Sequence, residues 1–292
     1  MPTRGKLVTL WFGGLAALGL GLGVFLSRQA LLELWYLRQL ESDDASDRIS
    51  AIHVLGEMRS REAAKRLLRF LVDEDRPEFF EALRAFAKIG PRAAEAAPKL
   101  VEAYFVVRDT FDETEDTNPT VAVRQALVGI GSPSVAPLII ALQNAVEEGY
   151  WSNGKVRRKF SVIFKSLGRD AAEALLDALA QSPDLGITVE DCVAAQGLSA
   201  LPLLIERLRS NSPSDQLWAA NIAWELAATH AEGVRAIADA RLDSREPLRS
   251  RLLHVLDLTT DFGRNVLLEA QGSGDVRTRR AAQSALDALT GE

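Results

Sequence analysis

Few side chains in this sequence have the types and spacing that catalysis or metal binding requires. His53, His230 and His254 each lack a second histidine or a cysteine at zinc-site spacing, so we expect packing or surface residues. Cys192 lies in the helical pattern DCVAAQ, where we expect a small buried hydrophobic side chain. Phosphate-binding glycine loops and nucleophile-elbow motifs are absent from the sequence. We therefore predict no catalytic residue, no metal, no cofactor and no enzymatic activity.

An acidic segment, VVRDTFDETEDTNPT, carries carboxylates at nearly alternating positions, the arrangement of a calcium loop. The EF-hand pattern also needs a central glycine and a distal glutamate, and both are missing here. We expect a solvated loop that projects from one face and offers a candidate contact. Its acids are Asp109, Asp112, Glu113, Glu115 and Asp116.

A basic segment, GKVRRKFSVIFK, follows an aromatic pair. At helical spacing its cations share one side and its apolar residues the other, which predicts an amphipathic helix with a basic solvent face. The alternative is a docking patch for an acidic partner or for lipid headgroups, anchored by the aromatic pair. The candidate residues are Tyr150, Trp151, Lys155, Arg157, Arg158, Lys159 and Lys165.

Helices must position these residues, because apolar side chains recur at helical spacing and no stretch alternates as strands do. Similar segments return every 30–40 residues or so, which is typical of stacked helical pairs. Within a unit, a hydrophobic-Gly break ends the first helix, since glycine tolerates the left-handed conformation. We expect Trp218 and Trp224 to fill the interior of the sixth unit. The breaks, 34, 41 and 37 residues apart, are Leu55-Gly56, Ile89-Gly90, Ile130-Gly131 and Leu167-Gly168.

Two short elements recur at fixed places in these units. A Val-Arg pair opens several first helices, and an apolar-Pro-Leu triplet opens second helices: Val123-Arg124, Val156-Arg157, Val276-Arg277, Ala136-Pro137-Leu138 and Leu201-Pro202-Leu203. This pattern resembles HEAT repeats, particularly the short type of phycobilisome-lyase-like proteins. The resemblance covers roughly residues 43–289 and implies an all-α, HEAT-type α-solenoid of about seven and a half helical pairs. It also implies that Arg124, Arg157 and Arg277 brace neighbouring repeats.

The N-terminal part contains an uncharged stretch of 21 residues, LVTLWFGGLAALGLGLGVFLS. As a helix it is about 31 Å long, enough to cross a hydrocarbon core. A cleaved signal has a shorter apolar stretch and a small-x-small site, so we favour an uncleaved anchor. Gly19 and Gly23 would let a second membrane helix, or a second copy, approach closely, although glycine is also common in such helices. The expected segments are a flank (1–6), a transmembrane helix (7–27), a juxtamembrane helical linker (28–42) and the solenoid (43–292).

The charge distribution bears on orientation and on partners. Arg4, Lys6 and the amino group precede the predicted span, while Arg28 and Arg38 follow it, which favours a single-pass protein with repeats on the extracytoplasmic side. Residues 1–40 carry four basic side chains and one acidic one, so the net charge of −6 leaves −9 on the rest. Such an acidic soluble part disfavours nucleic-acid binding.

These observations predict a membrane-anchored HEAT-repeat scaffold or adaptor that mediates protein–protein interaction at the membrane surface. Its partners would be proteins, membrane proteins among them, and a homo-oligomer could form through the glycine-rich helix. The alternative, implied by the resemblance, is a chromophore (bilin) lyase or isomerase. The membrane anchor and the absence of an identifiable site argue against that alternative.

Overall fold

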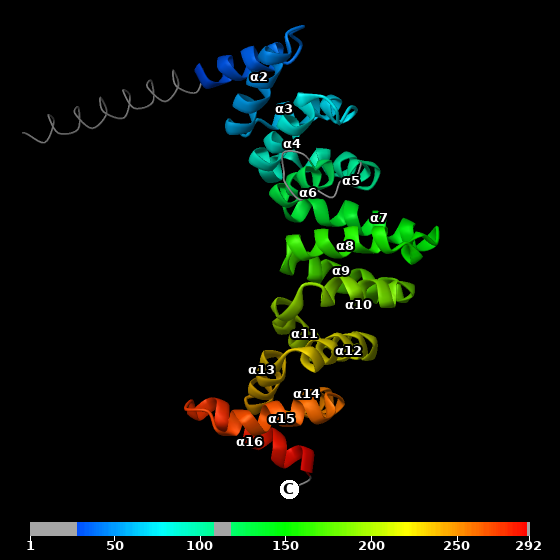
Figure 1. The fold of residues 1–292 in the computed structure, drawn as a ribbon, viewed down its shortest axis with the longest axis vertical. Helices are drawn as coiled ribbons and strands as arrows, with labels where there is room; N and C mark the ends of the chain where they lie inside the picture. Colours follow the sequence, from blue (N-terminus) through cyan, green and yellow to red (C-terminus); the bar gives the residue numbers. More distant parts are fainter. Residues whose placement is uncertain (1–27, 108–117, 291–292) are drawn as a thin grey trace, which may run out of the picture. The chain divides into compact units, whose positions relative to one another are not determined.

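The computed structural model describes residues 28–107 and 118–290, and every regular element in them is helical (Figure 1). No strand occurs among these residues, which confirms the all-α prediction. The chain divides into two compact units, Met1–Gly131 and Ser132–Glu292. In chain order the α-helices from α2 to α16 run as seven pairs and one final helix.

The first unit contains a helical segment at residues 28–39 and then helices that pack on their neighbours in the chain. The central helix α4 begins with Pro77 at its first turn and buries an apolar stripe of Phe79, Leu83 and Phe86. It packs against both α2 and α6. The bounds are α2 (Ala45–Glu57), α3 (Arg61–Leu67), η1 (Leu68–Leu71), α4 (Pro77–Ile89), η2 (Gly90–Ala96), α5 (Ala97–Val106) and α6 (Pro119–Ile130).

In the second unit, α8, α10, α12 and α14 pack in succession, and α16 packs on α13 and α15. Small side chains on α16, Ala281, Ala282 and Ala285, are buried in that contact. The α-helical bounds are α7 (Val135–Glu147), α8 (Gly154–Leu167), α9 (Arg169–Gln181), α10 (Gly186–Ala194), α11 (Leu201–Arg207), α12 (Pro213–Thr229), α13 (Ala231–Leu242), α14 (Leu248–Leu258), α15 (Thr260–Gln271) and α16 (Val276–Thr290). Short 3₁₀ turns connect some of them: η3 (Ser132–Ser134), η4 (Tyr150–Ser152), η5 (Pro183–Leu185) and η6 (Gly197–Ala200).

Three of the four predicted glycine breaks are present. Gly90, Gly131 and Gly168 follow the last residues of α4, α6 and α8 with φ of 67°, 76° and 70°. A side chain at such a φ is strained, so glycine is the residue that ends these helices most easily.

The break predicted at Gly56 is wrong. Gly56 lies inside α2, and the chain turns at Arg59, which has a φ of 52°. The glycine instead permits close packing, because a Cβ built on it would lie 3.0 Å from the Cα of Ala85 in α4. The same residue type therefore serves helix contact here and helix termination in the later repeats.

The two tryptophans of the sixth unit do not share one environment. Trp218 is half-buried, and a Cβ built on Gly186 of α10 would lie 2.7 Å from its ring. Trp224 is 40% exposed and its Nε1 donates a 2.8 Å hydrogen bond to the carbonyl of Leu258 at the end of α14. The prediction that both fill the interior is wrong for Trp224, whose indole links two neighbouring helices instead.

The predicted transmembrane helix (7–27), with Gly19 and Gly23, lies outside the described residues, and so does the acidic loop that begins at Asp109. Across the residues that are described, no single helix combines the length and apolar composition of a membrane span. Two pairs pass that test only when joined, α6 with Ser132–Glu147 and α10 with Gly197–Arg207, and they are bent by 117° and 112°.

Candidate interaction surfaces

The predicted basic segment forms α8, and the aromatic pair lies in the turn η4 before it. Gly149, with a φ of 74°, reverses the chain after α7, and Ser152 donates a 3.1 Å hydrogen bond from its hydroxyl to the Gly149 carbonyl. Asn153 then caps α8, its Oδ1 accepting from the backbone N–H of Lys155 at 3.0 Å. This capped start fixes where each cation of α8 lies.

The aromatic pair is split between interior and surface. The Trp151 ring lies 6.0 Å from that of Phe160, which in turn stacks on Phe164 at 6.1 Å, and both phenylalanines are buried. The Nε1 of Trp151 is enclosed and has no hydrogen-bond partner within the described part of the chain. Tyr150 is 57% exposed. Only the tyrosine of this pair therefore offers an open aromatic surface.

Three cations of the predicted patch are exposed together. Lys155, Arg158 and Lys165 fall within about 80° of the α8 circumference, at 100° per residue. None of the three forms an ion pair with another described residue, and Lys159 beside them is half-buried. We call Lys155, Arg158 and Lys165 the α8 basic face.

Arg157 points elsewhere and has a structural role. Its Nε lies 3.6 Å from a carboxylate oxygen of Asp191 on α10, an ion-pair distance that is too long for a hydrogen bond. The bracing implied for the Val-Arg elements is therefore present at Arg157. Arg157 is consequently the least suitable of the α8 cations for contact with another molecule.

The other two Val-Arg positions give different results. Arg277 of α16 binds Asp239 of α13 and Asp243 just after α13, with its Nε 2.5 Å from Asp239 and its Nη2 2.5 Å from Asp243. These two carboxylates raise the pKa of Arg277 further above its usual value. Within the described residues no ion pair of Arg124 is found, so its implied bracing role stays a prediction.

The side chains that suggested chemistry are separated. Cys192 is buried, and burial raises the pKa of its thiol to about 12, although a hydrogen bond from Ser161 acts in the opposite direction. The three histidines are exposed and separated: His53 lies on α2, His230 between α12 and α13, and His254 on α14. Among the described residues, no group of three His, Cys, Asp or Glu side chains is arranged to hold a metal ion.

The helix at residues 28–39 is attached to the first repeat by one of its faces. Leu37 and Leu40 are buried, and their carbonyls accept hydrogen bonds from Arg66 and Arg69. On the same face, Glu33 accepts a hydrogen bond from a hydroxyl of the first repeat. The predicted helical linker thus packs on the repeats.

The opposite face of this helix is open and carries large apolar side chains, with the exposed Arg38 among them. Leu31, Leu34 and Trp35 are 67%, 62% and 52% exposed, and Leu32 beside them is 43% exposed. We call these four residues the linker apolar face. Sequence reasoning did not separate it from the buried face, although the spacing of residues 31, 34 and 35 is that of one helix side.

Comparison with known proteins assigns no family, since no family model matches the chain. Two structures of engineered proteins from the Northeast Structural Genomics Consortium are similar, at 19% and 20% identity and a TM-score of 0.32 each. Both alignments cover 88% of this chain, and 98% and 95% of the engineered chains.

A natural protein is similar to the same extent: the complex of CpcE and CpcF of phycocyanin lyase from Nostoc sp. PCC7120. The identity is 20%, the TM-score is 0.31, and the alignment covers 88% of this chain and 94% of that one. At such identities and TM-scores none of the three structures assigns an activity or a partner to this chain. The predicted alternative, a bilin lyase-like activity, therefore stays a prediction.

Proposed function

We propose that this chain is a membrane-anchored helical-repeat scaffold that holds an acidic protein partner close to a bilayer. Residues 7–27 form the transmembrane helix, the linker helix lies at the membrane surface, and the repeats lie on the extracytoplasmic side. Gly19 and Gly23 provide a face where a second membrane helix packs. The role is one of positioning rather than catalysis.

The linker apolar face is the observation that carries this proposal. It comes directly after the 21 uncharged residues, and it is exposed while the other side of the same helix is buried against the first repeat. A helix with Leu and Trp on one side inserts that side at the boundary between headgroups and acyl chains. The exposed leucines and Trp35 would then be covered by lipid.

The α8 basic face supports an acidic protein as the partner. The whole chain carries a net charge of −6, so three exposed cations that pair with no described acid form a local exception. Opposite charge on a partner would steer its encounter with this surface, and Tyr150 adds an exposed ring at the edge. Anchoring then raises the effective concentration of this surface for partners in the same membrane.

Alkaline carbonate extraction of membranes tests the anchor. We expect the full chain to stay in the pellet, and L18R/L20R to move into the supernatant, because each arginine at the centre of a span costs about 2.5–3.5 kcal/mol. The matched control is V72R, which places the same charge at a position that is 87% exposed in the first unit. Release of the unaltered full chain by carbonate would contradict the anchor.

Site-specific photo-crosslinking tests the partner surface. A photoreactive phenylalanine analogue at Tyr150 of the full chain, in intact membranes, should give one dominant protein adduct. K155E/R158E/K165E should remove the adduct, whereas R209E/R245E/R264E, with the same change in charge at exposed positions elsewhere in the second unit, should keep it. Loss of the adduct in both triple variants, or in neither, would refute the proposed surface.

A further inference from the structure

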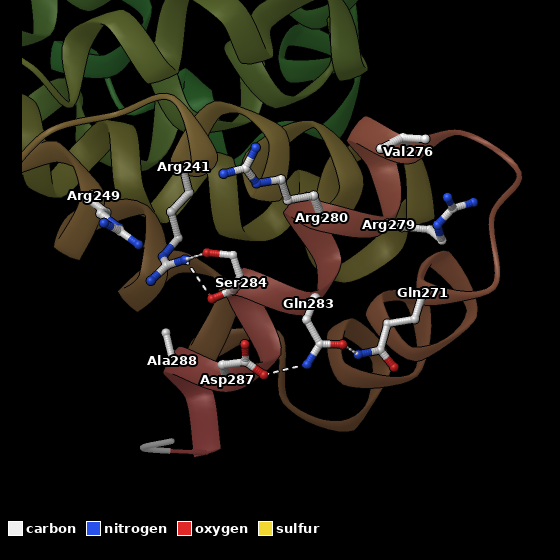
Figure 2. A pocket seen from close by; sticks show the side chains of 10 residues that line it. All are labelled: Arg241, Arg249, Gln271, Val276, Arg279, Arg280, Gln283, Ser284, Asp287 and Ala288. Atoms are coloured by element: carbon white, nitrogen blue, oxygen red, sulfur yellow. Dashed lines mark hydrogen bonds between the residues drawn. The ribbon is translucent and has the colours of Figure 1, made fainter.

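A wide, open cavity of about 680 Å³ lies among α13, α14, α15 and α16 in the second unit (Figure 2). Four of the side chains that line it are arginines: Arg241 of α13, Arg249 of α14, and Arg279 and Arg280 of α16. Like charges repel when gathered around one space, so such a lining suits a negatively charged occupant.

Arg241 is the buried member of the group. It is only 4% exposed, and its Nη1 donates to Ser284 of α16, to the carbonyl at 2.9 Å and to the hydroxyl at 3.1 Å. Its Nε is enclosed and has no hydrogen-bond partner in the described part of the chain. A buried charged donor without an acceptor is costly, which makes this atom an unfilled position for a ligand oxygen.

Two further arginines accompany Arg241. Figure 2 shows the Arg249 guanidinium directed from α14 toward that of Arg241, and Arg280 extending from α16 toward α13. Both side chains are exposed, and neither forms an ion pair with a described residue. Arg279 is different, because its Nη1 donates to the carbonyls of the turn before α16 at 2.6 and 3.1 Å.

The acids near this cavity do not balance the arginines. Asp287 lines it but accepts a 2.5 Å hydrogen bond from Gln283, and Glu246 accepts one of 2.6 Å from the Ser250 hydroxyl. Among the described residues, these two carboxylates against four arginines leave an excess of two positive charges. Burial and the neighbouring Arg249 lower the pKa of Arg241, although Glu246 acts in the opposite direction. An arginine nevertheless stays protonated, so the repulsion persists until an anion enters.

We propose that this cavity binds a phosphate dianion, with Arg241, Arg249 and Arg280 as its ligands. Guanidinium groups donate paired N–H bonds that match phosphate oxygens, and a dianion neutralises the excess charge. The cavity is larger than one phosphate, and the side-chain amides of Gln271 and Gln283, which are joined by a 2.5 Å hydrogen bond, line the remaining space. A small molecule that carries hydroxyl groups beside its phosphate therefore fits the same chemistry. This site is independent of the scaffold role and of the membrane.

Titration calorimetry of the full chain in a non-ionic detergent tests the site. The probes are inorganic phosphate, glucose 6-phosphate and unphosphorylated glucose. We expect saturable binding of both phosphates below about 10 mM and none of glucose. Tighter binding of glucose 6-phosphate would identify a phosphorylated small molecule as the ligand, and equal binding would identify free phosphate. Absence of binding for both phosphates would overturn the proposal.

Variants separate this site from non-specific attraction to a basic surface. R249A and R280A should each weaken phosphate binding roughly tenfold, as expected for the loss of one charged hydrogen-bonding group. R264A, which removes an exposed arginine of α15 outside the cavity, should bind as the unaltered chain does. Arg241 stays unchanged in this series because its bonds to α16 also hold the fold. Equal weakening by R264A, or unchanged binding in R249A/R280A, would refute the site.

The pH dependence provides a second readout. The second pKa of a phosphomonoester lies near 6, so the dianion is lost at lower pH while the arginines stay charged. Affinity should therefore fall as the pH decreases from about 7.5 to about 5. Phosphate should also raise the midpoint of thermal unfolding, because it binds only the folded cavity. Constant affinity across that range would contradict recognition of a dianion.

Discussion

The ion pair between Arg48 of α2 and Glu78 of α4 offers a sharp test of how neighbouring repeats are held together. Glu78 is 2% exposed, and its Oε1 accepts from Nε of Arg48 at 2.9 Å and also from Nη2. Arg48 further donates from Nη1 to the carbonyls of Ser42 and Asp43, both at 2.8 Å. This one side chain thus connects α2, α4 and the segment before α2.

We predict that R48M costs about 3–5 kcal/mol, the range for leaving one charge of a buried pair without its partner. R48M/E78L removes both charges and should recover most of that loss, because an apolar pair of similar volume avoids the desolvation penalty. Hydrogen exchange of the α2 and α4 amides is the measurement, since repeats can open locally without unfolding of the whole chain. Equal destabilisation in the single and double variants would refute the argument.

The pH dependence of the stability of α2 and α4 should differ between the native chain and R48M. Burial alone would raise the pKa of Glu78, but the hydrogen bond and charge of Arg48, helped by a backbone N–H, hold it below its usual value. The pair therefore stabilises the native chain above the unfolded-state pKa of about 4.3, and this contribution is lost as pH falls through the lower folded-state pKa. In R48M only a backbone N–H and the charge of Arg76 oppose burial, so the pKa of Glu78 should rise and its stabilising contribution above the unfolded-state pKa should be reduced. If stability changed with pH in the same way in both proteins, burial of Glu78 would not govern this pH dependence.

Three further predictions follow from particular contacts. G129A should destabilise the first unit by about 1–3 kcal/mol, because the new Cβ would lie 2.5 Å from the Cα of Ala87. The control G154A has nothing within 4 Å of its new Cβ and should be neutral or slightly stabilising. Urea titrations measure both changes. W224F should weaken protection of the α14 C-terminus in hydrogen exchange by about 1 kcal/mol, since its indole bond is lost. Cys192 should resist iodoacetamide in the folded chain and react at once in denaturant. The reason is that its folded-state pKa is about 12, so thiolate forms only as the pH approaches that value. Equal reaction rates in the folded and denatured states would contradict its burial.

The sequence predicted what depends on local chemistry. Gly90, Gly131 and Gly168 were identified as helix ends because glycine tolerates the left-handed conformation that ends a helix, and Pro91 and Ser132-Pro133 after the first two favour a new helix start. Gly56 was misassigned, because a glycine that permits close helix contact has the same sequence signal as one that ends a helix. Only the position of Ala85, in another helix, distinguishes the two cases.

Contacts between distant positions were harder to predict. The α8 basic face was identified from spacing, but the diversion of Arg157 to Asp191 depends on how α8 packs on α10. The cavity around Arg241 was not predicted, because its arginines come from three helices and each by itself resembles an ordinary surface residue. Burial of Arg241 follows from the approach of α16, which no local pattern reveals.

The attachment of the helix at residues 28–39 has a mechanical consequence. Arg66 and Arg69 donate hydrogen bonds to carbonyls near its C-terminal end, and Ser60 donates one to Glu33 one to two turns earlier. A force applied to the chain before residue 28 would act on these hydrogen bonds at the same time and parallel to the helix axis. No flexible segment between residue 28 and these bonds would have to extend first. Tension would thus reach α3 before any other helix of the first unit, and single-molecule stretching should register that junction as its earliest rupture.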